Sequence, residues 1–346
     1  VSVLQAEPLP TYLNSNETER NLPAPNLPAD AFRPVTPKLQ VPAPAAQPQP
    51  LMMDTRVLIR KVRIEGGTVY PLSELSENYK GLLDREVPIS DLIEATRRLT
   101  QRYQEDGYLL SYAFLPVQDF AEGRLRVVLV EGYIQDYEVQ GDIGRVSGYL
   151  DKLVAKLKAE RPLTRKTFDR YTSLMSRLPG ITLAARVPPP GTTDGASKLL
   201  VQASRKPFTT SMNLTESSRD DIQALFTASS NAQTAMAEQL SVSALVPPGE
   251  DKEHYYRVDY SQYLNAEGTQ LALSASRYRS DPSAVVRLTN DINLKQHREN
   301  DRYSIGLNHP LIASPNEWLS VATRFYAVDD TTDYRVVGFP LKVSTN

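Results

Sequence analysis

The sequence contains no cysteine, only three histidines and a single tryptophan among its 346 residues. The missing cysteine excludes disulfides, thiolate metal sites and cysteine nucleophiles together. His254, His297 and His309 are far apart, without neighbours at metal-ligand spacing, so we expect no metal and no other cofactor. No run of about 18 apolar residues occurs, which excludes a membrane-spanning helix from this sequence.

Charge of one sign is also lacking, because 39 basic and 41 acidic residues leave a formal net charge of -2. A nucleic-acid-binding protein needs a basic face, so we expect no nucleic-acid partner. GxSxG, Walker A and GxGxxG motifs are absent, and acid pairs such as Asp329-Asp330 fall in expected turns. We therefore expect no enzyme and no small-molecule substrate. Arg97, Arg98 and Arg102 form a basic patch, either a solvated helix face or a contact for an acidic partner.

The most informative stretch present runs from Gly107 to Ile134. Two runs rich in aromatic and β-branched residues, 108–117 and 125–130, are predicted strands of a hairpin, with a polar turn over 118–123. Before them, apolar residues at helical spacing predict a helix over 90–106, with Ser90 as its N-cap. Gly107 stands where a glycine ends a helix.

The segments around this hairpin predict a duplicated α+β unit of about 75 residues. A strand over 57–65 and a helix over 71–83 come before the helix and hairpin already described. The same order then repeats: a strand over 133–140, a helix over 147–157, a helix capped by Thr164, and strands over 181–187 and 198–203. Each unit therefore has the order strand, helix, helix, strand, strand.

After Pro207 the sequence changes to segments that alternate apolar and polar residues with a period of two. Examples are Leu240, Val242, Ala244 and Val246, and later Leu319, Val321, Thr323 and Phe325. Strands with one apolar and one polar face are typical of a transmembrane β-barrel, and a soluble β-sandwich alternates in the same way. The alternation alone does not decide between the two.

The order helix, Gly, strand, Leu-Pro-x-Gln, turn, Gly, strand, Glu-Gly over residues 90–132 resembles the first POTRA domain of TpsB transporters, the two-partner secretion branch of the Omp85 superfamily. The resemblance implies two α+β POTRA domains followed by an antiparallel transmembrane β-barrel in the outer membrane. It places the POTRA domains in the periplasm and favours the barrel over the sandwich. It also implies a function, translocation of a large TpsA-type adhesin or haemolysin that the POTRA domains bind.

The expected organisation has four parts. Residues 1–54 form a tail and Pro-rich linker, with 11–22 as a possible pore-plugging helix; residues 55–132 and 133–206 form the POTRA domains; residues 207–346 begin the barrel. Val1 is not Met, so we expect a mature or trimmed chain. About eight strands fit after residue 207, where the family has about sixteen, so we expect the barrel to be truncated.

A sheet edge offers unpaired N–H and C=O groups, so we expect an extended client to add as a strand to the first hairpin strand of each repeat. The residues of these strands are Leu109, Leu110, Tyr112, Phe114 and Leu115 in the first repeat and Ile181, Leu183 and Ala185 in the second. Gln118, Gly123 and Gly132 are expected to shape the turns. The expected partners are the secreted exoprotein and the outer-membrane bilayer.

Two other functions fit parts of the pattern. An Omp85-type assembly factor would insert other membrane proteins, and a soluble periplasmic scaffold would carry POTRA domains on a β-sandwich. Membrane fractionation and heat-modifiable gel mobility separate the scaffold from either barrel. The identity of the client and the gating residues do not follow from the sequence.

Overall fold

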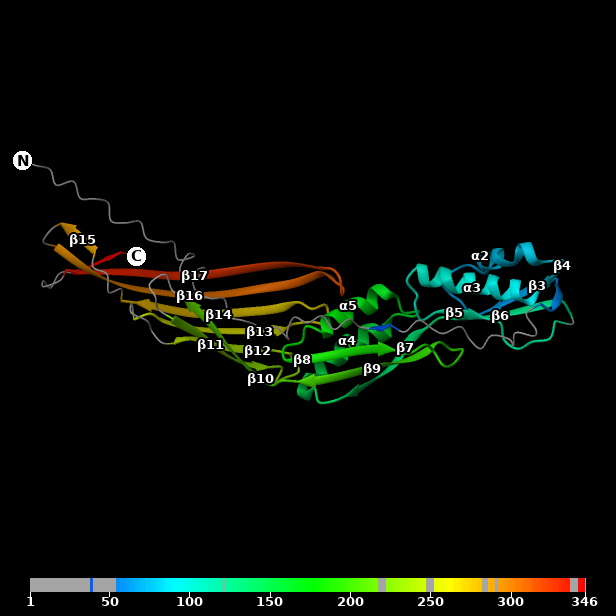
Figure 1. The fold of residues 1–346 in the computed structure, drawn as a ribbon, viewed down its shortest axis with the longest axis horizontal. Coiled ribbons are helices and arrows are strands. Elements are labelled where there is room, and N and C mark those ends of the chain that lie inside the picture. Colours follow the sequence, from blue (N-terminus) through cyan, green and yellow to red (C-terminus); the bar gives the residue numbers. More distant parts are fainter. Residues whose placement is uncertain are drawn as a thin grey trace, which may run out of the picture.

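The computed structural model describes residues 38–39, 54–120, 122–216, 222–246, 252–281, 286–289, 292–336 and 342–345. Two α+β units and one large sheet follow each other along the long axis of the molecule (Figure 1). The possible plug helix, 11–22, lies outside the described residues. Among the helices that the structure describes, none has the length and apolar character needed to cross a membrane.

The first unit has a three-stranded sheet covered by helices. Its sheet has the order β3-β6-β5, in which β3 and β6 are parallel and β5 is antiparallel to β6. A separate antiparallel pair, β2-β4, lies at the end of the molecule far from the large sheet (Figure 1). The elements are β2 (Arg56–Ile59), β3 (Lys61–Glu65), α2 (Leu72–Ser76), the 3₁₀ helix η3 (Glu77–Leu82), β4 (Arg85–Pro88), α3 (Ile89–Glu105), β5 (Tyr112–Phe114) and β6 (Arg124–Val130).

Three local predictions for this unit are wrong. The strand expected over 57–65 is split at Arg60, because its two halves pair in different sheets. The helix expected over 71–83 ends as a 3₁₀ turn, and the short strand β4 follows it. Pro88 rather than Ser90 is the N-cap of α3, and no side chain caps that end. Proline suits this position because it has no N–H group to satisfy and its φ is already fixed near helical values.

The second unit repeats the layout. Its strands have the order β8-β9-β7, with β7 parallel and β8 antiparallel to β9. The hydroxyl of Thr164 accepts a hydrogen bond from the Thr167 N–H at 3.3 Å, which confirms the predicted cap of α5. The elements are β7 (Tyr133–Gln140), the 3₁₀ helix η4 (Gly144–Val146), α4 (Ser147–Ala159), α5 (Arg165–Met175), β8 (Ile181–Val187) and β9 (Ala196–Arg205).

Each unit has its own hydrophobic core between sheet and helices. The first core holds Leu92, Leu99 and Tyr103 of α3 against Leu125 and Val127 of β6. The second core is built on α4, α5, β8 and β9, and it also contains Leu110 from the first unit, which is fully buried. The two units are therefore joined by packing as well as by the chain.

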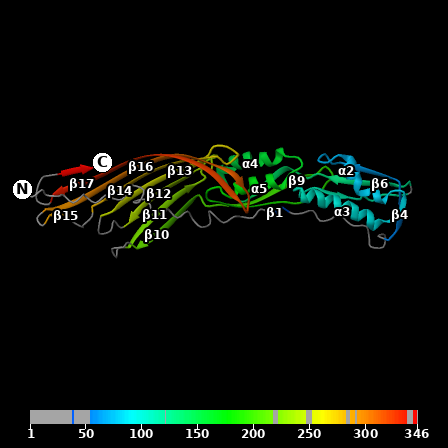
Figure 2. The same ribbon diagram turned by 90° about the horizontal axis from the view of Figure 1, so that it is seen from above.

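The rest of the chain forms one antiparallel sheet of nine strands in the part that the structure describes. Its order is β10-β11-β12-β13-β14-β16-β17-β18. The short strand β15 pairs with the part of β16 that extends past the end of β14. Figure 2 shows the strands side by side, running obliquely away from α4 and α5. The bounds are β10 (Phe208–Glu216), β11 (Ile222–Asn231), β12 (Gln239–Val246), β13 (His254–Tyr263), β14 (Gln270–Ser280), β15 (Val286–Thr289), β16 (Ile292–Ala313), β17 (Trp318–Val336) and β18 (Lys342–Thr345).

This sheet is not packed face to face against a second sheet within the described residues, so the β-sandwich alternative is wrong. The described strands do not close into a ring either, since β10 and β18 lie at opposite edges. The fold is therefore two POTRA-like α+β units followed by an open stretch of barrel-type sheet.

Candidate functional site

The predicted edge strand of the first unit is shorter than expected. Only Tyr112–Phe114 form β5, and they are half-buried. Leu109 and Leu110 lie in a turn closed by a hydrogen bond from the Ser111 N–H to the Tyr108 carbonyl at 3.0 Å. Leu110 is buried in the second core, so this segment lies away from the sheet of the first unit. Leu115 comes after the strand and packs against the first core.

The outer edge of β5 is also covered. The Ala113 N–H donates to the Thr100 hydroxyl at 2.9 Å, and that hydroxyl lies 3.3 Å from the Ala113 carbonyl oxygen, which accepts from it. Main-chain groups alternate in direction along a strand, so Tyr112 and Phe114 face β6 while Ala113 faces outward. A side chain of α3 therefore satisfies the outward groups that an added strand would need.

The edge strand of the second unit, β8, has seven residues. The Lys206 N–H donates to the Gly180 carbonyl at 2.7 Å, which sets the alternation along the β8–β9 ladder. Because main-chain groups alternate in direction along a strand, the N–H and C=O groups of Ile181, Leu183 and Ala185 point away from β9, toward the outer edge of the sheet. Their side chains are buried in the second core, so any contact with a client here is made by the main chain.

Part of this edge carries an added strand within the chain itself. The segment β1 (Lys38–Leu39), from the Pro-rich N-terminal region, pairs in parallel with β8 at Arg186 and Val187. Along residues 181–185 the outer edge of β8 has no strand partner in the described ranges. This pairing could not be predicted from the sequence, because two residues have no measurable periodicity.

The three turn residues lie at tight contacts. The Gln118 side chain donates to the Arg126 carbonyl at 2.9 Å and accepts from the Arg126 N–H at 2.7 Å, so it extends the ladder of β6 where β5 has ended. Gly123 has a φ of +66°, in the left-handed region, and its carbonyl accepts from Arg60 and Lys61. A Cβ atom at Gly132 would lie 2.4 Å from the Leu110 Cβ, so only glycine fits between the two units.

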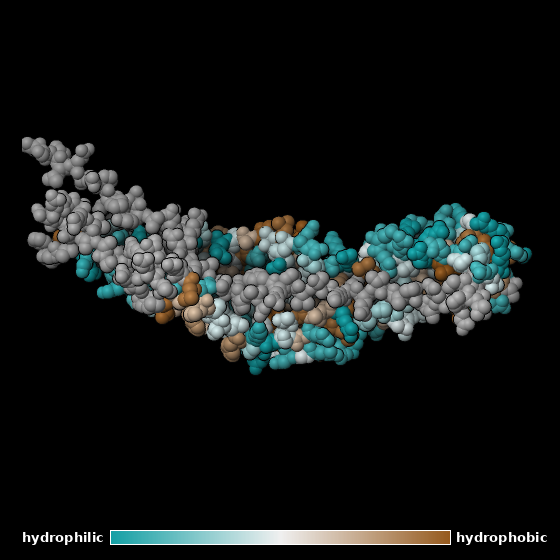
Figure 3. Space-filling model, in the orientation of Figure 1, coloured by the Kyte–Doolittle hydropathy of each residue, from teal (hydrophilic) through white to brown (hydrophobic). Residues whose placement is uncertain are grey.

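The large sheet has one apolar and one polar face. The register places apolar side chains of neighbouring strands on a common face, for example Met212 with Phe226, Val242 with Val258, and Leu273 with Ile305 and Phe325. These seven side chains are between 38% and 71% exposed. Figure 3 shows brown, apolar patches on the surface of the molecule. A continuous belt of this kind suits a lipid environment.

Most of the opposite face is lined by small polar groups and charges, and a small buried apolar cluster of Leu225, Leu245 and Tyr255 lies on the same face. Thr227 contacts Ser243, and Ser229 contacts Ser241, each through hydroxyl groups 2.8 Å apart. Beside them the Arg257 guanidinium makes a two-pronged pair with Asp259, at 2.7 and 2.8 Å. All of these Ser, Thr, Arg and Asp side chains except Ser243 line a cavity of about 240 Å³, together with residues of β14, β16 and β17. Such a face suits water rather than a packed core.

The apolar belt ends at one level along the strands. Arg277 follows Ala275 by two residues and therefore lies on the same face of β14, where it pairs with Asp301. Arg279, two residues further along, pairs with Glu299 at 2.6 Å. Alternation keeps these four charged side chains on the face of Leu273 and Ile305. The change from apolar to charged residues marks the border of the belt on the side away from the POTRA-like units.

At the other end of the sheet, α4 and α5 contact the turn between β13 and β14. The Tyr149 ring stacks on Tyr263 with a centroid separation of 5.0 Å, and its hydroxyl donates to the Asn265 carbonyl at 2.8 Å. Glu267 accepts from Lys156 at 2.9 Å and from the Tyr171 hydroxyl at 3.0 Å. The Lys156 hydrogen bond is the main reason that the pKa of Glu267 lies below its ordinary value.

A second turn, between β16 and β17, completes this junction. The Arg177 guanidinium lies over the Trp318 ring at 3.6 Å, and the Arg177 carbonyl accepts from the Tyr263 hydroxyl at 3.2 Å. Arg170 donates to the Leu311 carbonyl at 3.3 Å. The second unit is therefore held against the sheet by contacts that sequence reasoning did not find, because each joins residues about 85 to 140 positions apart.

No cluster of three or more His, Asp or Glu side chains among the described residues could hold a metal ion. His309 lies 2.9 Å from the Thr269 hydroxyl, and His297 lies 2.7 Å from an Asp281 oxygen. In the basic patch of α3, Arg97 and Arg98 lie near Glu94, and Arg102 pairs with Glu74 and lies over the Tyr70 ring.

Comparison with known proteins agrees with this architecture. Residues 57–132 match the ShlB-type POTRA domain family. The heme/hemopexin transporter protein HuxB of Haemophilus influenzae strain 86-028NP is 19% identical over 278 residues, covering 79% of this chain and 48% of HuxB. CdiB from Escherichia coli has a TM-score of 0.57 at 17% identity, over 86% of this chain and 60% of CdiB. The chain therefore carries a ShlB-type POTRA domain and is similar to TpsB-type transporters of the Omp85 superfamily.

A second solved relative has the same fold: CdiB from Acinetobacter baumannii has a TM-score of 0.50 at 14% identity, over 89% of this chain and 61% of that one. The curated relatives bear the name of a transporter rather than an enzyme. The chain spans about half the length of the curated relatives it matches, 48% of the HuxB named above.

Proposed function

We propose that this chain is part of an outer-membrane pore that translocates a large secreted exoprotein, of the TpsA adhesin or haemolysin type, from the periplasm to the cell surface. The observation that carries this proposal is the two-faced sheet joined to a POTRA tandem. Lipid would contact the apolar belt, and the Ser-, Thr- and Arg-lined face would border the aqueous path of the client. Soluble proteins rarely expose an apolar surface of this size to water, which argues against a soluble scaffold.

The client is captured as an extended strand at the outer edge of β8. Ile181, Leu183 and Ala185 direct main-chain groups to this edge, and the pairing of β1 with β8 at Arg186 and Val187 supports it as a strand acceptor. Main-chain recognition does not depend on the client sequence. The edge of β5 takes a smaller part, because Thr100 already binds Ala113.

Cross-linking in cells that export the client tests this proposal. A photo-reactive residue replaces Ala184, which is exposed on β8, and the control variant carries it at Gln140, exposed on β7 at the opposite edge of the same sheet. The partner to be probed is the exported exoprotein of the proposed function. We expect cross-links to the client from position 184 and not from position 140. Equal cross-linking from both positions contradicts strand addition at β8.

A pair of proline variants provides the functional arm. Ala185→Pro removes an N–H that faces the open edge, whereas Ala184→Pro removes one that faces β9. Ala185→Pro is expected to reduce export several-fold while the chain stays folded in the membrane, and Ala184→Pro to disturb folding as well. If the variants instead block insertion of other outer-membrane proteins and leave export intact, the chain is an assembly factor.

A further inference from the structure

The pair β2-β4 at the tip of the first POTRA domain has an open edge that the function proposed above does not use. In the described part of the chain β2 pairs with β4 alone. The Ile89 N–H donates to the Thr55 carbonyl at 3.0 Å, so Thr55, Val57 and Ile59 direct their main-chain groups toward β4. The N–H and C=O groups of Arg56 and Leu58 consequently face away from β4.

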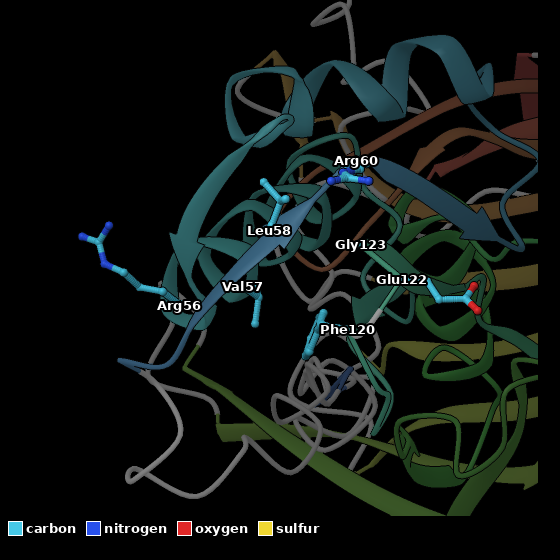
Figure 4. Close-up of a pocket in the computed structure, with 7 residues that line it drawn as sticks. All are labelled: Arg56, Val57, Leu58, Arg60, Phe120, Glu122 and Gly123. Carbon is cyan, nitrogen blue, oxygen red and sulfur yellow. The ribbon is translucent and has the colours of Figure 1, made fainter.

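These groups border a groove between β2 and the turn before β6 (Figure 4). The groove has a volume of about 380 Å³ and is lined by Arg56, Val57, Leu58, Arg60, Phe120, Glu122 and Gly123. Val57 and Phe120 point to the same side of it, and both are only partly buried against the first core. Gly123 packs closely against β2, because an added Cβ atom would lie 3.1 Å from the Leu58 carbonyl oxygen and the Gly123 carbonyl accepts from the Arg60 N–H at 2.7 Å.

The charges around the groove are mostly positive. Arg56, Arg60 and Lys61 are exposed, and within the described ranges none of them has an ion-pair partner. The carboxylate in the lining, Glu122, is paired with Arg124. Arg63 and Arg126 continue the positive charge along the exposed face of β3 and β6, where Glu65 is their shared partner. An acidic ligand therefore meets guanidinium and ammonium groups that are still available.

We propose that this edge binds an extended acidic segment of the exoprotein, which adds to β2 as a strand. Side chains alternate between the two faces of a strand. Those on the Val57 side of the added strand would contact Phe120 and are expected to be apolar, whereas those on the Arg56 and Arg60 side are expected to be Asp or Glu. The identification of the partner as the exoprotein rests on the proposed function; the chemistry of the site does not.

A direct binding measurement with the full chain in detergent tests the site. The probe is a fluorescent nine-residue peptide that alternates valine with aspartate, and the control peptide has lysine in place of aspartate. We expect the acidic peptide to bind and its affinity to fall with added salt, as for any contact between exposed charges. Equal affinity for the two peptides would overturn the proposal.

Variants locate the peptide on the chain. The double variant Arg56→Glu/Arg60→Glu should weaken acidic-peptide binding by about tenfold or more, because both cations become repulsive. Arg97→Glu/Arg98→Glu is the matched control, since it reverses two exposed arginines on α3, and should leave binding within about twofold. Leu58→Pro, which removes an outward N–H, should also weaken binding. Loss of binding in the α3 variant, or retention in the β2 variant, contradicts the assignment.

Export of the exoprotein separates failure of this site from failure of the proposed function. If the peptide binds at β2 but the chain exports nothing, the site stands and the proposed function is wrong. If export proceeds and the peptide binding does not depend on Arg56 and Arg60, the site is wrong and the proposed function stands.

Discussion

The two POTRA domains have the same strand order and differ at their edges. In the first, the outer strand β5 has three residues and a hydroxyl from α3 binds its outward main-chain groups. In the second, β8 has seven residues and its outer edge pairs with a strand, β1, at one end. One fold therefore presents a closed edge and a strand-accepting edge, and the side chain at position 100 is one cause of the difference.

The domains also differ in what they are joined to. The second domain contacts two turns of the membrane sheet through α4 and α5 and takes Leu110 of the first domain into its core. At the far end of the first domain, the pair β2-β4 is distant from the large sheet (Figure 1). The second domain is thus the fixed connection to the large sheet, and the first domain lies at the outer end of the molecule.

The largest expected effect comes from the residue that joins the domains. Leu110→Ala removes a fully buried side chain and should lower the free energy of unfolding by about 2–5 kcal/mol. Because Leu110 belongs to the second core, the loss should appear there although the residue precedes that domain in sequence. Hydrogen exchange of the full chain measures it, as faster exchange in α4 and β8 than in β3 and β6.

The control is Leu125→Ala, which removes an equally buried leucine from the first core. Its effect should stay in the first domain, with α4 and β8 unchanged. If Leu110→Ala speeds exchange only in the first domain, the packing link between the domains is wrong.

Sequence patterns predicted the second domain better than the first. The strand Ile181–Val187, the strand Tyr133–Gln140 and the Thr164 cap are where periodicity and capping placed them. The Thr164 cap depends on a residue only three positions away, and the side chains of β8 alternate regularly between buried and exposed. The alternation after Pro207 likewise predicted the two faces of the membrane sheet, because register fixes which side chains share a face.

The mistakes lie where residues distant in sequence decide the structure. The run 108–117 is predicted as one long strand, but only Tyr112–Phe114 form it. Leu110 instead packs in a core built mainly from residues after position 134. The closed edge of β5 depends on one hydroxyl thirteen positions away, at Thr100. The contacts of Glu267 with Lys156 and Tyr171 likewise join separate domains. A single sequence carries no periodic signal for such pairs.

A middle-sized effect is expected at Glu131, which follows β6 at the end of the first domain. Its carboxylate accepts from the Thr68 N–H at 2.7 Å, the Val69 N–H at 3.0 Å and the Tyr103 hydroxyl at 2.8 Å. Burial alone raises the pKa of Glu131, but these hydrogen bonds outweigh it and hold the pKa below the ordinary value. Glu131→Gln should cost about 1–3 kcal/mol, since a charged acceptor is lost.

The pH dependence of unfolding checks this contribution. A carboxylate whose pKa is depressed in the folded state stabilises the fold above its unfolded pKa, about 4.3 for Glu, and the contribution is lost as the pH falls through the folded pKa. The wild-type protein should therefore lose stability in the first domain on acidification below about pH 5, and Glu131→Gln should lose less. Identical acid profiles for the two proteins would remove Glu131 from this account.

The smallest expected effect concerns the edge that distinguishes the domains. Thr100→Ala removes the hydroxyl that binds both main-chain groups of Ala113, and water can replace it because the residue is only half-buried. The expected cost is about 1 kcal/mol. Thr100→Ser, which keeps a hydroxyl, should cost less. The decisive readout is the exchange rate of the Ala113 amide, which should rise in Thr100→Ala and stay near the wild-type rate in Thr100→Ser. If that rate does not change in Thr100→Ala, the hydroxyl is not what closes the edge of β5, and the contrast with β8 must come from the shorter strand alone.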